Sequence, residues 1–134
     1  MDTIRQVQYY VTQVSNKPGE AARILEALRG LSLLAFTGFP SGRKAQLDFV
    51  PEDALSFTLA AKQAKLKLKA KKGGFLVQGP DRGGAVAEVM QKLAKAKINV
   101  TAIDAVSGGM GRWGAILWVK PKDVAKASKA LGAI

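Results

Sequence analysis

The hydrophobic and polar positions of residues 79–106 predict the end of a strand, a glycine-rich loop, a helix and a second strand. Before the predicted helix, Gly83 and Gly84 allow the backbone to bend sharply, and Asp81 is a candidate helix N-cap. The helix itself has one buried face, because its apolar side chains follow the i, i+3, i+4, i+7 spacing at Val86, Val89, Met90 and Leu93.

The same pattern occurs at residues 14–39, where a loop at 15–19 precedes a helix with apolar Ala21, Ile24, Leu25 and Leu28. One constant offset of 65 residues aligns Asn16 with Asp81, Gly19 with Gly84 and Leu28 with Leu93. Repetition at a constant spacing indicates two copies of one structural unit. The chain is therefore predicted to be a tandem of two similar units, and the two loops are the candidate functional parts.

The remaining pattern completes each unit. The first unit is expected to contain strands at 7–14, 31–39, 45–50 and 65–72, with helices from about 20 and from about 52. The second unit is expected to contain strands at 75–78, 98–106 and 112–120, a hairpin loop at 107–111, and a last helix from 121. Gly73 and Gly74 mark the boundary, which divides the chain into units 1–72 and 73–134.

The first unit thus has the order β-α-β-β-α-β, and the second unit lacks the final strand. This is the ferredoxin-like order, so the predicted fold class is α+β, with tandem antiparallel sheets whose helices cover one face. The missing strand would leave residues 75–78 as an open sheet edge without any charged residue. Open edges recruit another chain or are covered, so we expect a two-fold homodimer, or else coverage by residues 1–6.

The composition excludes several kinds of chemistry. The chain has no cysteine and no histidine, which removes disulfides, thiolate nucleophiles, cysteine-based metal sites and the commonest general base. No signal-peptide pattern is present, and no apolar run approaches the ~18 residues of a membrane span. We therefore expect a cytoplasmic protein that is not an enzyme and that uses no cofactor or metal.

Two features resemble functional motifs without their context. Residues 109–114 match G-x-G-x-x-G, but a dinucleotide site needs a helix after the motif, and strands are predicted on both sides. Asp48 and Asp104 lie on predicted strands, where a solvated strand face explains an acidic residue without catalysis.

The net charge of +11 raises the alternative of a basic, ferredoxin-like nucleic-acid-binding module. Residues 65–72 alternate lysine with apolar residues, which fits both an edge strand protected by charge and a comb that binds phosphates. An RNA-recognition module would need aromatic side chains exposed together on its central strands. Trp113 and Trp118 are an odd number of positions apart, so their side chains point to opposite faces of a strand. Packing in a core is therefore a better explanation for these tryptophans than stacking on nucleic-acid bases.

The two loops suit a small anion or zwitterion. The free N–H groups of a first helical turn attract a carboxylate, and Gly19 or Gly84 allows close approach to the backbone. Asn16 or Asp81 could accept hydrogen bonds from an ammonium group. Ordinary helix capping by the same two side chains is the alternative.

Both loops, with the helices that follow them, resemble the opening of an ACT domain. The similar segments are Asn16-Lys17-Pro18-Gly19 followed by Ile24, Leu25 and Leu28, and Asp81-Arg82-Gly83-Gly84 followed by Val89, Leu93 and Ile98-Asn99-Val100. The second loop departs from the pattern, with Gly83 where proline is usual. The resemblance implies amino-acid contacts at Asn16, Lys17, Pro18, Gly19 and Glu20, at Asp81, Arg82, Gly83, Gly84 and Ala85, and at Ile98 and Asn99.

ACT domains are regulatory modules that commonly bind amino acids between two copies. The resemblance therefore implies a sensor of a small molecule, by family similarity an amino acid, that regulates an enzyme in trans. No catalytic domain accompanies the two units in this sequence.

Overall fold

The computed structural model describes residues 1–134 and contains six strands, four α-helices and one short 3₁₀ helix. The strands are β1 (Thr3–Ser15), β2 (Leu33–Ser41), β3 (Lys44–Pro51), β4 (Lys69–Pro80), β5 (Val100–Gly109) and β6 (Arg112–Val119). The helices are α1 (Glu20–Ala27), α2 (Ala54–Gln63), α3 (Ala85–Lys95), η1 (Pro121–Asp123) and α4 (Val124–Leu131). None of the helices has the length and apolar character that a membrane span requires.

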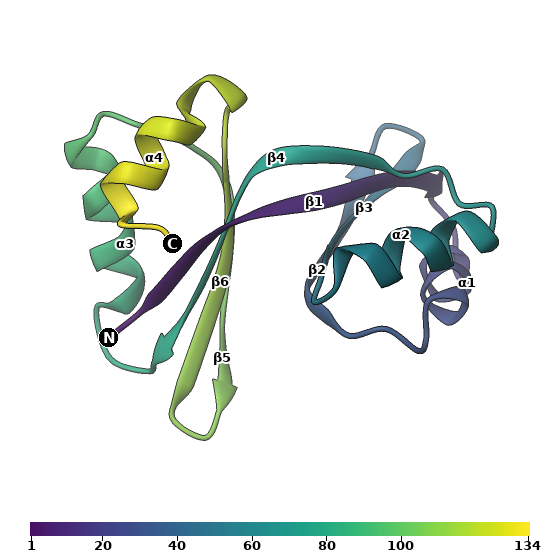
Figure 1. Ribbon diagram of the computed structural model, residues 1–134, viewed down its shortest axis with the longest axis horizontal. Helices are drawn as coiled ribbons and strands as arrows, with labels where there is room; N and C mark the ends of the chain where they lie inside the picture. The colour runs from purple at the N-terminus through teal and green to yellow at the C-terminus, as the bar shows by residue number, and fades with distance from the viewer. The chain divides into compact units, whose positions relative to one another are not determined.

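Two compact units are present, and the chain passes from one to the other between Lys71 and Lys72, within one residue of the predicted boundary. An inserted unit comprises Tyr9–Lys71, and a terminal unit comprises Met1–Gln8 together with Lys72–Ile134. The predicted units, 1–72 and 73–134, placed residues 1–8 with residues 9–72, whereas in the structure residues 1–8 belong to the terminal unit. Strands β1 and β4 are long because each begins in one unit and ends in the other, and both can be followed in Figure 1.

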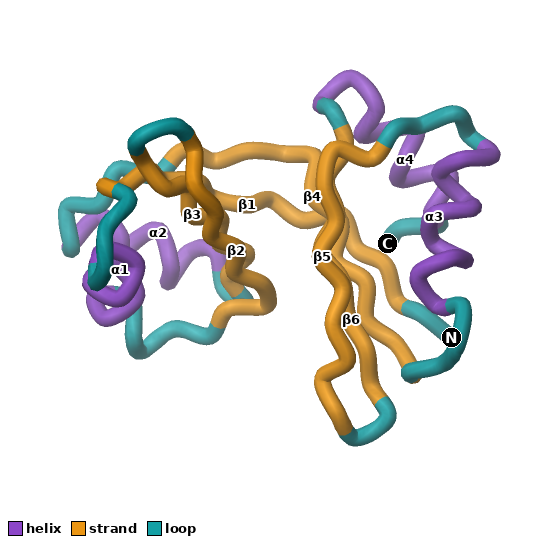
Figure 2. The backbone as a smooth tube through the Cα atoms, turned by 180° about the vertical axis from the view of Figure 1, so that it is seen from behind, coloured by secondary structure: helices purple, strands orange, loops and turns teal.

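The inserted unit has the predicted β-α-β-β-α-β order, with hydrogen-bonded neighbours in the order β2-β3-β1. Both β2 and β1 pair antiparallel with β3, and α1 and α2 pack on one face of the sheet (Figure 2). The centre of its core is aromatic: the ring of Phe57 lies 5.2 Å from that of Tyr10 and 5.5 Å from that of Phe49. Favourable tilted aromatic pairs therefore hold α2 against the two strands.

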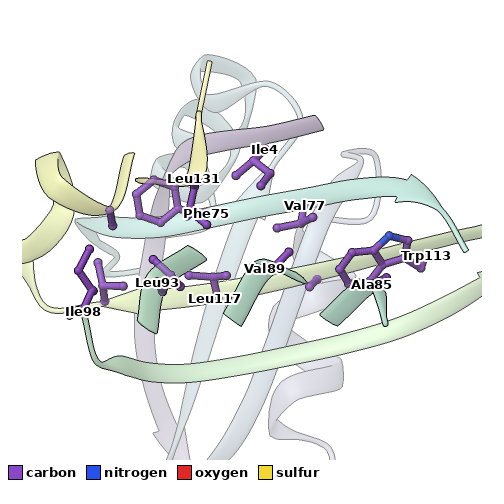
Figure 3. Close-up of a cluster of buried hydrophobic side chains, with 13 residues drawn as sticks. Ile4, Phe75, Val77, Ala85, Val89, Leu93, Ile98, Trp113, Leu117 and Leu131 are labelled. Atoms are coloured by element: carbon purple, nitrogen blue, oxygen red, sulfur yellow. The ribbon is translucent and has the colours of Figure 1, made fainter. Parts of the chain in front are cut away.

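The terminal unit has hydrogen-bonded neighbours in the order β1-β4-β6-β5, with α3 and α4 on one face. The apolar side chains of its core meet between the helices and the sheet, as Figure 3 shows, and include Ile4, Phe75, Val77, Val89, Leu93, Trp113, Leu117 and Leu131. The expected packing of Trp113 in a core is confirmed. The glycine-rich residues 109–114 join β5 to β6, as the hairpin interpretation required.

The predicted open edge at residues 75–78 is wrong. The start of β1 lies beside β4 in the sheet order, Ile4 is only 4% exposed, and the backbone N–H of Ile134 donates to the Ile4 carbonyl at 2.9 Å. The N-terminal segment thus takes the place of the missing fourth strand, which was the alternative to the dimer. A homodimer is no longer needed to cover this edge.

Asp2 fastens the beginning of this strand. Its carboxylate accepts two hydrogen bonds from the Arg82 guanidinium, both at 3.0 Å, and one from Trp113 Nε1 at 3.1 Å. Space for the carboxylate exists because residue 79 is glycine: a Cβ there would lie 2.0 Å from Asp2 Oδ1. A side chain at residue 79 would therefore displace Asp2 and its partners.

The hydrogen bond from Arg82, more than any other cause, lowers the pKa of Asp2 below its ordinary value of 3.8. A carboxyl group with a lowered folded-state pKa stabilises the fold above its unfolded pKa, and this stabilisation disappears as the pH falls through the folded value. We predict that Asp2→Asn lowers the free energy of unfolding by about 1–3 kcal/mol at neutral pH. The difference from the unsubstituted protein should shrink below about pH 4, as urea unfolding at several pH values would measure. An equal difference at every pH would contradict the ion pair.

The edge-filling role of β1 gives a second prediction. Ile4→Ala should lower the free energy of unfolding by about 2–4 kcal/mol, because it removes a buried side chain from the core of the terminal unit. Val106→Ala is the matched control, since Val106 is 71% exposed and its truncation should cost less than about 0.5 kcal/mol. Equal costs for the two variants in chemical denaturation would show that residues 1–8 do not belong to this core.

Candidate ligand-binding site

The two loops end in the same backbone geometry. Gly19 is the N-cap of α1 with φ 89°, and Gly84 is the N-cap of α3 with φ 83°. Both angles lie in the left-handed region, which glycine adopts without the steric cost of a Cβ. The pair aligned by the constant sequence offset is therefore also a structural pair.

Neither helix start is capped by a side chain. The prediction that Asp81 is an N-cap is wrong, because Gly84 occupies that position and Asp81 lies three residues earlier. Asn16 likewise precedes the Gly19 cap by three residues. The capping interpretation of these two polar residues is thus excluded. The N–H groups of Glu20 and Ala85 donate to the carbonyls of Lys17 and Arg82, both at 3.4 Å, so the next N–H groups of each first turn are the ones available to an anion.

The α3 pocket has a volume of about 420 Å³ and lies at the start of α3. It is lined by Asp81, Arg82, Gly84, Ala85, Val86, Ala87, Ala105, Val106, Ser107 and Trp113. The Ser107 hydroxyl donates to Asp81 Oδ2 at 3.2 Å, so strand β5 positions the carboxylate at the pocket wall. Asp81 keeps one oxygen without a protein donor, which can accept from an ammonium group.

The α1 pocket is the equivalent site in the inserted unit, with a volume of about 300 Å³. It is lined by Val14, Ser15, Asn16, Lys17, Glu20, Ala21, Phe36, Gly38, Phe39, Pro40, Ala45 and Leu47. Phe36 and Phe39 are 37% and 45% exposed, which is high for phenylalanine in a folded protein. This pocket therefore combines a helix N-terminus with an accessible apolar wall from β2.

The charged groups of the two pockets differ. Arg82 donates to Asp2 and to Glu88, and these hydrogen bonds, the one to Asp2 most of all, raise the pKa of Arg82 above its ordinary value. The positive charge of Arg82 is therefore already matched by two carboxylates. Lys17 has no ion pair in the α1 pocket, while Glu20 accepts from Arg23 Nη2 at 3.3 Å, which lowers the pKa of Glu20.

The predicted contact residues fall into three groups. Asn16, Lys17 and Glu20 line the α1 pocket, and Asp81, Arg82, Gly84 and Ala85 line the α3 pocket. Pro18, Gly19 and Gly83 lie in the same two loops without lining a pocket. Ile98 and Asn99 are not brought to either pocket: they follow the C-terminal end of α3, where Ile98 is buried in the core and Asn99 is exposed.

Sequence reasoning missed the pocket walls that β2, β5 and β6 provide. Phe36, Phe39, Ser107 and Trp113 are the clearest examples. A signal was present at residues 36–40, where two phenylalanines stand beside glycine and proline, but residues 31–39 were predicted only as a strand. For Ser107, which contacts Asp81 across 26 residues of sequence, no local pattern predicts the contact.

One acidic residue of the inserted unit also differs from its predicted surroundings. Asp48 was expected on a solvated strand face, but it is 6% exposed and accepts from Thr37 Oγ1 at 3.1 Å and from Gln46 Nε2 at 2.9 Å. Asp104 is exposed, as expected. The structure has no cluster of three or more metal-ligating side chains.

No protein-family model and no curated protein matches the sequence. Solved structures do match over almost the whole chain. Protein BT0572 from Bacteroides thetaiotaomicron has a TM-score of 0.78 at 15% identity, covering 96% of this chain and 88% of its own. The ligand-free regulatory subunit of aspartate kinase from Thermus thermophilus has a TM-score of 0.63 at 18% identity, covering 96% and 92%.

A third match is aspartokinase III from E. coli in complex with aspartate and ADP, with a TM-score of 0.55 at 19% identity. It covers 97% of this chain but only 32% of the kinase chain. These likenesses show the fold alone, which is an α+β fold that this chain shares with regulatory subunits of aspartate kinase.

The left-handed N-cap gives a testable prediction. Gly84→Ala should destabilise the protein by about 1 kcal/mol, because alanine is strained at φ 83°. Gly83→Ala is the matched control: its φ is not positive and an added Cβ meets no atom within 4 Å. Thermal unfolding of both variants measures the difference, and equal melting temperatures would contradict the described loop geometry.

Proposed function

We propose that this protein is a small-molecule sensor that binds an amino acid at the starts of α1 and α3 and regulates an enzyme in trans. The observation that carries the proposal is the pair of uncapped helix N-termini, each beginning at a left-handed glycine and each lying at a pocket. A helix N-terminus with a purely structural role does not need to lie at a pocket, whereas both of these do.

In the α1 pocket, the ligand carboxylate would accept from the first-turn N–H groups, with Lys17 adding positive charge. Asn16 and Glu20 offer oxygens for an ammonium group, and Phe36 and Phe39 offer contact to an apolar side chain. In the α3 pocket, Asp81 would bind the ammonium group. Because Arg82 is already paired, the carboxylate there would depend on backbone groups.

The comparisons support a regulatory role of this kind. Two matched structures consist of a regulatory subunit of aspartate kinase. The E. coli kinase was crystallised with aspartate, which makes an amino acid a reasonable ligand class for this chain. The proposal includes no catalytic activity, no cofactor and no metal, and the cytoplasmic location stays a prediction.

The proposal is tested by a thermal-shift screen against the twenty amino acids. Anything that binds only the folded state raises the melting temperature. Asn16→Ala should reduce the shift that arises at the α1 pocket, and Asp81→Ala the shift that arises at the α3 pocket. Thr101→Ala, at an exposed position of β5 outside both pockets, is the control variant. If no amino acid raises the melting temperature and none gives a heat of binding in calorimetry, the sensor proposal is wrong.

The homodimer also stays a prediction, now without the argument from an open edge at residues 75–78. Two of the sheet edges are β2, which contains no charged residue, and β5, whose one charged residue is Asp104. Edges without lysine favour association between chains. Light scattering after size exclusion should give twice the 14.2 kDa chain mass, and a monomer mass at micromolar concentration would exclude the dimer.

A further inference from the structure

A third pocket lies in the inserted unit, away from both helix N-termini, and has a volume of about 360 Å³. That volume lies within the range of ordinary small-molecule sites. Its walls are formed by Val11, Thr12, Gln13, Gln46, Lys67, Leu68, Lys69 and Lys71. Three of these eight residues are lysines and none is acidic, so the pocket is basic.

The lysines converge because of strand geometry. Lys69 and Lys71 are two residues apart in β4, so both side chains leave the same face about 7 Å apart. Lys67 precedes the strand by two residues and reaches the same pocket. On the other side, Gln13 of β1 and Gln46 of β3 are register partners. Cations thus face the neutral side-chain amides of Gln13 and Gln46, which can donate hydrogen bonds.

The positive charge of this pocket is not matched within the protein. Lys67, Lys69 and Lys71 form no ion pair, and positions 54–80 contain no aspartate or glutamate. The buried Asp48 stands behind Gln46, and both of its carboxylate oxygens already accept hydrogen bonds. A ligand with several negative charges would therefore meet three unpaired ammonium groups.

Edge protection accounts for only part of this arrangement. Strand β6 pairs with β4 only from Gly74 onward, so Lys69 and Lys71 do lie on a stretch with one unpaired side, where lysine discourages aggregation. Protection of an edge requires charge alone. It requires neither a hollow of this volume nor a pair of glutamine side chains opposite the charges.

We propose that this pocket binds a compact anion with two or more phosphate groups, either inorganic pyrophosphate or polyphosphate, or the phosphate chain of a nucleotide. Lysine acts on phosphate as a flexible point charge, and the neutral donors opposite it satisfy the remaining phosphate oxygens. This site is independent of the amino-acid pockets, so its success or failure does not decide the proposed function.

The test is calorimetric titration with inorganic pyrophosphate at low and at physiological salt. Lys67→Gln combined with Lys69→Gln should weaken binding by roughly tenfold or more, because it removes two of the three ammonium groups from the pocket. Lys92→Gln combined with Lys95→Gln is the matched control, since it removes the same charge from exposed positions on α3. The control should weaken binding by less than about threefold, through general electrostatics alone.

Two further titrations identify the form of the ligand. If inorganic tripolyphosphate and adenosine triphosphate bind with equal affinity, the protein recognises the phosphate chain alone. If adenosine triphosphate binds more tightly, the nucleoside also contacts the protein. Both results support the site. Equal losses in the two double variants, no heat with pyrophosphate at low salt, or binding of single-stranded oligonucleotide alone would overturn it.

Discussion

The terminal unit depends on one constraint, which is that its sheet must obtain a fourth strand from the opposite end of the chain. The helices α3 and α4 can bury a core only if the sheet is wide enough, and the start of β1 supplies the width beside β4. Asp2 secures this strand by using Arg82 and Trp113 as partners at a position where residue 79 has no side chain. Buried charges are tolerated when they are paired in this way.

That constraint also separates the two ligand pockets chemically. Arg82 lies in the α3 pocket, yet its guanidinium belongs to the network that holds the N-terminal strand. In the α1 pocket no such network exists, and Lys17 forms no ion pair. Two units with the same backbone geometry at Gly19 and Gly84 thus offer different charges to a ligand.

The order of elements could be predicted from sequence because it rests on local patterns. The helical spacing of Val89 and Leu93 and the glycine pair at constant offset both report structure within a few residues. Val86, predicted on the same buried face, is 39% exposed. The position of residues 1–8 could not be predicted in the same way. The contacts of Asp2 with Arg82 and with Trp113 span 80 and 111 residues, and no periodicity encodes them. Ile98 was misplaced for a related reason, since a resemblance transfers positions but not the packing of this particular core.

Strands that begin in one unit and end in the other also impose an order of events on synthesis. The inserted unit is one continuous segment, so it can fold as soon as residues 9–71 have left the ribosome. Ile4, although made before the inserted unit, cannot bury its side chain until Phe75, Leu93 and Leu131 exist. The cost of closing so long a loop grows only with the logarithm of its length, so the delay is kinetic more than thermodynamic. During that interval residues 1–8 wait for their partners while the later-made inserted unit can already fold, and they are where a chaperone or a second nascent chain would find an unpaired strand.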